Sequence, residues 1–400
     1  MRVFLSCLVC RIVTFVLHKL GRGATSMPGK VALKVKRNVL KDLSENTKVI
    51  VVTGTNGKTT SCRILEEGLK KAGKSYFINK SGANLITGVT ASFIMNSTIT
   101  GKCKKDYAII ECDENAFKEV SRYIHCDVIL VTNVFRDQLD RYGEVTHTLN
   151  AIKESVKNLP NAIVCLDADC SLTYSMSKEI PNKIITFGVN VPFDKNAKAP
   201  EISDAKYCIF CKHEYDYTYH TYGHLGGFVC PNCGYKRPQP DFAVESVEEM
   251  KNDHSVVVAN LNGDRNIIRV NIGGAYNIYN AIGCAAALTA FGIDEKTVID
   301  AIEHFNGAFG RMEHFKAGNN TVNLILVKNP AGFSQTMNFL KNIDDDFTLI
   351  LSLNDNAADG RDISWIWDVD FAGIFEKANV KEIYVTGKRC YDMAVRVKYE

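Results

Sequence analysis

A glycine-rich stretch at residues 53–60, Thr-Gly-Thr-Asn-Gly-Lys-Thr-Thr, carries the residue types that bind phosphate. Gly54 and Gly57 would let the backbone turn tightly and bring its N–H groups close to phosphate oxygens. Lys58 would reach the outer phosphates of a nucleotide, and the Thr59 hydroxyl would bind Mg²⁺. A plain turn is the alternative, since the two glycines stand closer together than in G-x-x-x-x-G-K-[ST]. The predicted nucleotide-binding residues here are Gly54, Thr55, Asn56, Gly57, Lys58, Thr59 and Thr60.

Acidic and polar residues follow two further apolar runs. Glu111 ends the run 107–111, and ligands of open α/β sheets bind at the carboxyl ends of the strands. Glu111 is therefore the candidate Mg²⁺ ligand, with Asp113 and Glu114 as weaker candidates and a solvated acidic turn as the alternative. The polar run 132–143 directly follows the apolar run 127–131, which predicts that it belongs to a site.

Four of the fourteen cysteines form a C-x₂-C-x₁₈-C-x₂-C pattern. This spacing predicts a tetrathiolate zinc site, which would be structural because a closed Cys₄ site leaves no open position for substrate. The alternative is four unrelated cysteines. The remaining cysteines are spread through predicted strands and helices, which favours free thiols in a reducing compartment. The predicted zinc ligands are Cys208, Cys211, Cys230 and Cys233.

Two amides and an arginine complete the candidate nucleotide site. Asn277 and Asn280 lie three residues apart near the start of an alanine-rich helical run, so they would share one helix face. Two amides on one face can bind the edge of an adenine; capping by Asn277 is the alternative. Arg311 follows Gly310 near the end of this region, and its planar guanidinium suits a phosphate.

The elements that would position these residues alternate between strands and helices. Strand, loop and helix follow one another around the glycine-rich stretch, as a phosphate-binding loop requires. The same alternation continues along the chain and predicts an α/β fold with a doubly wound, mostly parallel sheet. A second α/β unit is expected after residue 315. Predicted strands are 48–52, 76–78, 107–111, 127–131, 162–166, 183–187, 255–258, 267–272, 323–328, 347–353 and 382–387, and predicted helices are 61–71, 88–95, 273–291 and 334–340.

The first 45 residues form a basic helical segment, with nine Lys or Arg and no acid before Asp42. Such a segment favours an anionic surface or ligand, and a solvated basic helix is the equal alternative. Its apolar patches are too short and too interrupted by charge to span a bilayer. We expect a break at residues 21–29 and a second helix at 31–43. The overall net charge of +3 excludes no class of partner.

Taken together, these motifs resemble the Mur ligases, which form amide bonds on peptidoglycan precursors with ATP. The resemblance rests on the loop 54–59, Glu111, Thr132-Asn133 with Asp137 and Asp140, the two asparagines, and Phe309-Gly310-Arg311. The cysteine ribbon and the tail 358–368 (Ala-Asp-Gly-Arg-Asp-Ile-Ser-Trp-Ile-Trp-Asp) are similar to the MurT family, the ligase-like subunits of lipid II isoglutaminyl synthase. One departure is Gln138, where many Mur ligases have His.

The resemblance implies amidation of the D-glutamate α-carboxylate of lipid II through an acyl phosphate. Ammonia would come from a GatD-type glutaminase partner. ATP, Mg²⁺ and structural Zn²⁺ are the implied cofactors. Lys58 and Glu111 would be catalytic, and Asp362, with Asp359 as second choice, would complete the partner's catalytic triad.

The resemblance also implies a domain order. It comprises a basic N-terminal segment (1–45), an ATP-binding central domain (46–314) with a zinc ribbon insertion at about 200–240, and a C-terminal MurT-type domain (315–400). A nucleotide-fold unit usually needs more sheet than the last domain is expected to contain, which leaves open whether that domain is complete. The expected location is the cytoplasm, with peripheral contact at the inner face of the membrane left open.

Two alternatives remain: a Mur or folylpolyglutamate synthase-type ligase that adds an amino acid, and a zinc-ribbon NTPase that binds nucleic acid. The ribbon and the two tryptophans of the tail oppose the first. Against the second, residues 212–229 are not basic, whereas nucleic-acid binders usually carry a basic groove.

Overall fold

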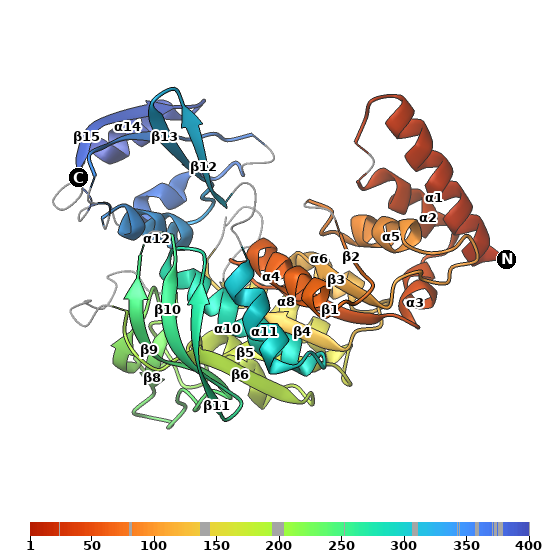
Figure 1. The fold of residues 1–400 in the computed structure, drawn as a ribbon, viewed down its shortest axis with the longest axis horizontal. Helices are drawn as coiled ribbons and strands as arrows, with labels where there is room; N and C mark the ends of the chain where they lie inside the picture. The colour runs from red at the N-terminus through yellow and green to blue at the C-terminus, as the bar shows by residue number, and fades with distance from the viewer. Residues whose placement is uncertain are drawn as a thin grey trace.

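A computed structural model gives the arrangement of most of the chain (Figure 1). The described residues are 1–23, 25–79, 82–136, 145–193, 204–251, 253–305, 311–341, 343, 345–356, 360–369, 371, 374 and 379–399, and the side chains of 311–314 are not among them. Asp137, Gln138, Asp140, Phe309, Gly310 and Asp359 therefore lie outside the description.

A nine-stranded sheet is the centre of the molecule, in the order β11-β10-β9-β6-β5-β4-β1-β3-β2. The seven strands from β9 to β2 are parallel, and β10 and β11 continue the sheet in antiparallel fashion. The predicted α/β class with a mostly parallel sheet is confirmed. The strands are β1 (Lys48–Thr53), β2 (Tyr76–Ile78), β3 (Tyr107–Glu111), β4 (Val128–Val131), β5 (Ile163–Asp167), β6 (Ile184–Val189), β9 (Phe242–Met250), β10 (Ser255–Leu261) and β11 (Asp264–Val270).

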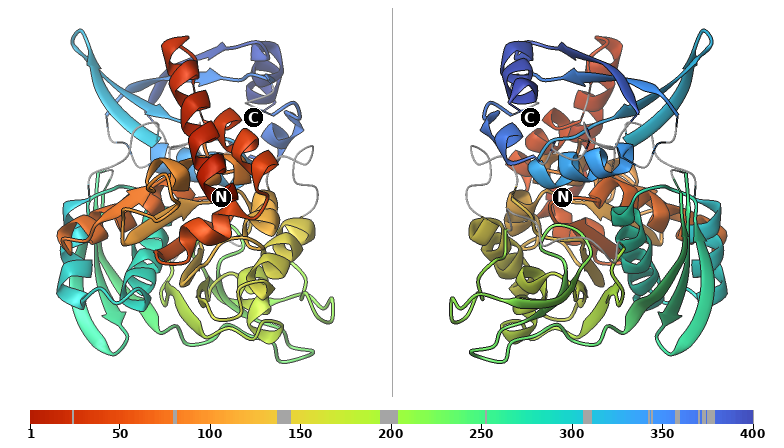
Figure 2. Two further views of the ribbon diagram at one scale, coloured as in Figure 1. Left: turned by 90° about the vertical axis from the view of Figure 1, so that its right-hand side faces the viewer. Right: turned by 90° about the vertical axis from the view of Figure 1, so that its left-hand side faces the viewer.

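Helices cover both faces of this sheet, as parallel strands require. Figure 2 shows α10 and α11 on one side of the sheet and α8 on the other. Strand β1 is buried along five consecutive residues after Lys48, which explains its uninterrupted apolar sequence. The helices of this domain are α4 (Lys58–Lys71), α5 (Ile86–Met95), α6 (Glu114–Val120), α8 (Val145–Lys157), α9 (Ser171–Ser175), the 3₁₀ turn η1 (Met176–Lys178), α10 (Ala275–Ala290) and α11 (Glu295–His304).

Three N-terminal helices pack beside α5: α1 (Arg2–Lys19), α2 (Met27–Val35) and α3 (Val39–Ser44). The prediction of one helix at 31–43 was wrong, because α2 begins earlier and Lys36 adopts an extended conformation after it. Pro28 is tolerated in the first turn, where its missing N–H is not needed. Gly29 allows close packing, since a Cβ there would lie 1.8 Å from the Thr87 carbonyl oxygen. Among the described residues, no helix is both long and apolar enough to cross a membrane.

An insertion between β6 and β9 forms a small ribbon. It contains the hairpin β7 (Asp216–His220) and β8 (Gly226–Val229), and tyrosines pack in its core. The ribbon falls where the cysteine pattern predicts it. The long strand β9 that follows was missed by the sequence reasoning.

The C-terminal part has a hydrophobic core of its own, separate from the core of the large sheet. It begins with the hairpin β12 (Arg311–Ala317) and β13 (Asn320–Ile325), so the expected domain boundary at 314/315 falls within β12. The strand expected at 323–328 ends earlier, at Ile325. The parallel pair β14 (Phe347–Ser352) and β15 (Val380–Thr386) then packs with α12 (Pro330–Leu340), the 3₁₀ helix η2 (Ser364–Asp368) and α14 (Cys390–Lys398).

Candidate functional site

The predicted phosphate loop connects β1 to α4 at the carboxyl edge of the sheet. Gly54 and Gly57 have φ angles of +120° and +85°, a region that favours glycine. A Cβ on Gly54 would lie 2.4 Å from the Thr132 hydroxyl oxygen, and one on Gly57 would lie 2.1 Å from Oδ1 of Asn280. Both glycines are therefore needed for close packing as well as for the turn. Thr60 is buried in α4 behind the loop, and Thr59 is partly exposed.

The residues that follow β4 hold the loop in shape. The Asn56 amide donates to Oδ1 of Asn133 at 2.9 Å, and the Thr132 hydroxyl donates to the Asn56 carbonyl at 2.7 Å. The Thr55 hydroxyl donates to the Phe135 carbonyl at 3.1 Å and accepts from the Phe135 amide at 3.0 Å. The described beginning of the polar run 132–143 thus supports the loop.

Lys58 forms a buried ion pair with Glu114, which the sequence analysis gave only as a weaker Mg²⁺ candidate. Its Nζ lies 2.6 Å from Oε1 of Glu114, and both side chains are almost fully buried. Nζ also donates to the Gly54 carbonyl at 2.5 Å and to the Thr55 carbonyl at 3.3 Å. The charge of Lys58 is thereby balanced by one carboxylate and two carbonyl oxygens.

Glu111 lies at the end of β3, beside β1, and is partly exposed. Its backbone is fixed by Asn79, which accepts from the Glu111 amide at 2.8 Å and donates to the Glu111 carbonyl at 2.9 Å. Asp113 caps α6 and accepts from the amides of Asn115 and Ala116. Glu111 and Thr59 supply a carboxylate and a hydroxyl, the oxygen ligands that Mg²⁺ prefers. The donor set fits the predicted ion, and the role of Glu111 stays a prediction.

Asn277 and Asn280 lie on the buried face of α10, against the loop. Asn280 donates to Oδ1 of Asn277 at 3.0 Å, and Asn277 donates to the Gly273 carbonyl at 2.6 Å. Gly274 occupies the N-cap position, so Asn277 contributes a further bond to the start of the helix. The predicted contact of both amides with adenine stays a prediction. The side chain of Arg311 is outside the description.

Among the described residues, long-range polar contacts connect the C-terminal part to the loop and to the segment after β4, and the sequence reasoning did not find them. The side-chain amide of Asn329 donates to Oδ1 of Asn56 at 2.9 Å, while its oxygen caps α12 by accepting from Gly332. Arg136 forms an ion pair with Asp368 at 2.6 Å. The Asn-Pro pair at 329–330 signals a helix start, but no local signal reveals its partner.

Asp362 lies just before η2 and is partly exposed. Its Oδ1 accepts from the Ser364 amide at 2.9 Å and from the Ser364 hydroxyl at 2.7 Å. It is far in sequence from the loop residues and belongs to the C-terminal unit. A role toward a partner protein stays a prediction.

The four cysteine sulfurs of the ribbon all lie within 4.8 Å of one another. Cys208 and Cys233 are 3.6 Å apart, and Cys211 and Cys230 are 3.4 Å apart, close to the roughly 3.8 Å that tetrahedral Zn–S bonds of ~2.3 Å imply. Each C-x-x-C turn is followed by a residue with positive φ, Lys212 and Gly234. Hydrogen bonds from the Asn232 side chain and the His213 backbone lower the pKa of Cys211 to about 6. The donor set and its shape fit zinc.

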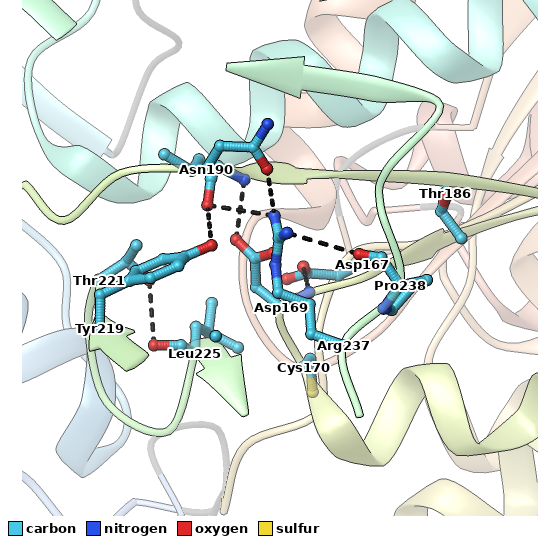
Figure 3. Close-up of polar contacts among 12 residues, drawn as sticks. Asp167, Asp169, Cys170, Thr186, Asn190, Tyr219, Thr221, Leu225, Arg237 and Pro238 are labelled. Atoms are coloured by element: carbon cyan, nitrogen blue, oxygen red, sulfur yellow. Dashed lines mark hydrogen bonds and ion pairs between the residues drawn. The ribbon is translucent and has the colours of Figure 1, made fainter. Parts of the chain in front are cut away.

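A buried ion pair anchors the ribbon to the sheet (Figure 3). Nε of Arg237, which follows the ribbon, lies 2.6 Å from Oδ1 of Asp169, and a second guanidinium nitrogen donates to Oδ1 of Asn190 at 2.9 Å. Tyr279 of α10 donates to the other oxygen of Asp169. Burial raises the pKa of Asp169 and, further, that of Asp167, one of whose oxygens has no partner among the described residues.

Comparison with known proteins identifies the family. The chain is 36% identical over its full length to "Lipid II isoglutaminyl synthase (glutamine-hydrolyzing) subunit MurT" of Streptococcus pneumoniae, covering 87% of that protein. The chain belongs to the MurT family. A MurT subunit of Staphylococcus aureus is 33% identical over 94% of this chain and 83% of the relative. Sequence profiles agree: "Mur ligase middle domain" matches residues 52–233, and "MurT ligase C-terminal" matches residues 326–400.

Solved structures place this MurT-family fold among the Mur ligases. A pseudomurein peptide ligase type C from Methanothermus fervidus has a TM-score of 0.64 at 20% identity and covers 88% of this chain and 79% of the other. MurF from Acinetobacter baumannii has a TM-score of 0.65 at 15% identity, with 92% and 80% coverage. At these identities the likeness shows the fold alone.

Proposed function

We propose that this chain uses ATP to amidate the D-glutamate α-carboxylate of lipid II, giving D-isoglutamine. The carboxylate oxygen would attack the γ-phosphorus of ATP and release ADP. Ammonia would then attack the carbonyl carbon of the acyl phosphate and release phosphate. The observation that carries the proposal is the identity to MurT subunits along the whole chain, together with a glycine loop built for phosphate.

The loop residues would position ATP and neutralise its charge, because phosphoryl transfer depends mainly on positioning and electrostatics. Lys58 would exchange its contacts with the loop carbonyls for the outer phosphates. Thr59 and Glu111 would hold Mg²⁺, which supplies charge neutralisation between the phosphates. Asn277 and Asn280 would bind adenine, and Arg311 would lie near the phosphates.

The ribbon would hold a structural Zn²⁺ through Cys208, Cys211, Cys230 and Cys233. A closed tetrathiolate site offers no position for substrate, so zinc would stabilise the ribbon and take no part in the reaction.

The partner in this proposal is a GatD-type glutaminase, which would release ammonia from glutamine. Asp362 would orient a histidine of that partner, as the acid of a Cys-His-Asp triad does. Because lipid II is lipid-linked, the reaction would take place at the inner face of the cell membrane.

The test is amidation of lipid II by the purified chain with ATP and Mg²⁺. Ammonium chloride and glutamine are compared as nitrogen sources, each with and without a GatD-type partner. We expect product from ammonium with the chain alone, and from glutamine only with the partner. Ligation of an amino acid in place of ammonia would overturn the proposal and favour an amino-acid-adding ligase.

The role of Asp362 is tested by the Asp362→Asn variant in the same assay. The variant keeps an oxygen that can accept from Ser364, so η2 should stay intact. We expect loss of the glutamine-driven reaction and retention of the ammonium-driven one. Asp346→Asn, a change of an exposed acid in the same unit, is the matched control and should retain both. Loss of both reactions in Asp362→Asn would contradict a role in the partner's triad.

A further inference from the structure

Helix α1 has small, uncharged side chains on its packed face and large apolar side chains on the opposite face. One face packs against the molecule and buries Ser6, Cys7, Cys10 and Thr14. The opposite face is apolar, yet it points to solvent: Ile12 and Phe15 are 52% and 68% exposed. Helix α1 lies at the front of the left panel of Figure 2, at the edge of the molecule. Helical spacing places Phe4, Leu5, Leu8, Ile12, Phe15 and Val16 in one row, here called the apolar stripe.

No charge interrupts the apolar stripe. Between Arg2 and Lys19 the sequence has one charged residue, Arg11. Its guanidinium is turned away and donates to the carbonyls of Ile94 and Ser97 at the C-terminal end of α5. A solvent-facing helix side of this composition needs a covering surface.

The charged residues that follow the apolar stripe in the N-terminal segment, before Asp42, are all positive. Lys19 continues the row one heptad after Ile12, and Arg22 follows it on the exposed end of the segment. Lys30 and Lys34 are exposed on α2, and no acid precedes Asp42. None of these four cations forms an ion pair within the described part of the chain.

We propose that the apolar stripe docks α1 on the surface of an anionic phospholipid bilayer. Its six side chains would enter the boundary between headgroups and acyl chains, with α1, about 27 Å long, lying in the plane of the membrane. The lysines and arginines would contact lipid phosphates. A second copy of the chain fits less well, because the two basic segments would repel each other. This inference rests on the proposed function and extends it, since docking on the membrane would bring the site to a lipid-linked substrate.

The first test is sedimentation of the full chain with vesicles. Vesicles of phosphatidylglycerol and phosphatidylcholine should carry the protein down, and vesicles of phosphatidylcholine alone should carry down much less. Ile12→Ser with Phe15→Ser should weaken binding by about tenfold or more, because two side chains no longer enter the lipid. Lys19→Gln and Arg22→Gln should each cost about fivefold, with the remaining binding less sensitive to salt.

The matched control is Ile267→Ser, which changes an exposed isoleucine on β11, far from α1 in the chain. It should bind vesicles like the unchanged protein. Equal vesicle binding by the variant with both Ile12→Ser and Phe15→Ser, called the stripe variant, would overturn the proposal. So would a dimer that the stripe variant abolishes in the absence of lipid, since a second copy would then be the occupant.

A kinetic comparison separates this inference from the proposed function. The stripe variant should amidate lipid II in anionic vesicles more slowly than the unchanged chain. It should keep the full rate on a short-chain, water-soluble lipid II analogue. If the unchanged chain amidates neither substrate, the proposed function fails while vesicle binding stands on its own measurement.

Discussion

Lys58 begins α4, where the helix dipole disfavours a positive charge. Glu114 begins α6, where the dipole favours a negative one, and the 2.6 Å ion pair joins these two helix ends. The pair holds the lysine close to the loop before any nucleotide arrives. Phosphate oxygens would then take over contacts that the loop carbonyls supply.

Gly57 gives the loop its turn and also packs closely against the side-chain amide of Asn280. Gly57→Ala would force a Cβ into Asn280 and impose a left-handed conformation that costs about 1–2 kcal/mol in an L-residue. We expect the dissociation constant for ATP to rise by about tenfold or more, measured by calorimetry. Gly73→Ala is the control, because Gly73 has a φ of +64° but nothing within 4 Å of the added Cβ. An equal loss of ATP affinity in both variants would show that backbone strain, and not the contact with Asn280, causes the loss.

His224 should make stability depend on pH. Burial lowers its pKa to about 4, whereas an unfolded histidine titrates near 6.5. Between these values the unfolded chain binds the extra proton, so acidification destabilises the fold, by about 2 kcal/mol at pH 5. His224→Gln lacks this term, so the melting temperature of the unchanged chain should fall relative to the variant, by several degrees between pH 7.5 and 5.

The carboxyls Asp167 and Asp169 act in the opposite sense. Their raised pKa values mean that the folded state binds protons first, so they add stability as the pH falls. The unchanged protein and the His224→Gln variant both contain these carboxyls, so their effect on the melting temperature cancels when the two are compared. A difference in melting temperature that does not change with pH would contradict the buried, neutral state of His224.

At the scale of elements, local sequence signals determined how well each part could be predicted. Uninterrupted apolar runs gave β1, β3 and β5 nearly to the residue, because strands buried on both faces need such runs. Strand β9 was missed because its apolar run, 242–244, is only three residues long and the rest of the strand is partly exposed and rich in glutamate. The break between α2 and α3 was missed because neither Gly nor Pro marks it. The Cys₄ spacing gave the ribbon, but not what the ribbon contacts.

Those contacts predict that a zinc ion held by the ribbon would stabilise the glycine loop from a distance. Tyr222 stacks on Phe135 at 5.7 Å, and a Cβ on Gly223 would lie 2.8 Å from the same ring. Phe135 in turn is hydrogen-bonded to Thr55 of the loop. Cys211→Ser should lose zinc, speed amide exchange in β7 and β8, and weaken ATP binding several-fold.

The readouts are zinc content, hydrogen exchange by mass spectrometry and ATP calorimetry. Cys103→Ser is the control, since this partly exposed cysteine lies outside the ribbon. Unchanged ATP affinity in a variant whose β7–β8 amides exchange freely would contradict the prediction that the ribbon stabilises the loop.

At the scale of the whole molecule, two polar contacts among the described residues join the C-terminal unit to the central domain, and Ala331 of α12 packs against the core of the large sheet. The partners are 232 residues apart for Arg136 and Asp368, and 273 apart for Asn56 and Asn329. No sequence pattern links positions so distant, which is why this part of the site could not be predicted. The ion pair is partly exposed on both sides and should contribute at most about 1 kcal/mol. Asn329 is fully buried, so the hydrogen bond from its side-chain amide to Asn56 should contribute more to the docking than the ion pair does.

Asn329 therefore allows the docking of the C-terminal unit to be separated from its folding. Serine caps helices about as well as asparagine, but its side chain is too short to reach Asn56. Asn329→Ser should keep the melting temperature of the C-terminal unit and still weaken ATP binding and enlarge the radius of gyration in solution scattering. Asn329→Ala should do the same and also lose about 1 kcal/mol of stability with the cap. If Asn329→Ser leaves both affinity and radius unchanged, the hydrogen bond to Asn56 does not hold the two units together.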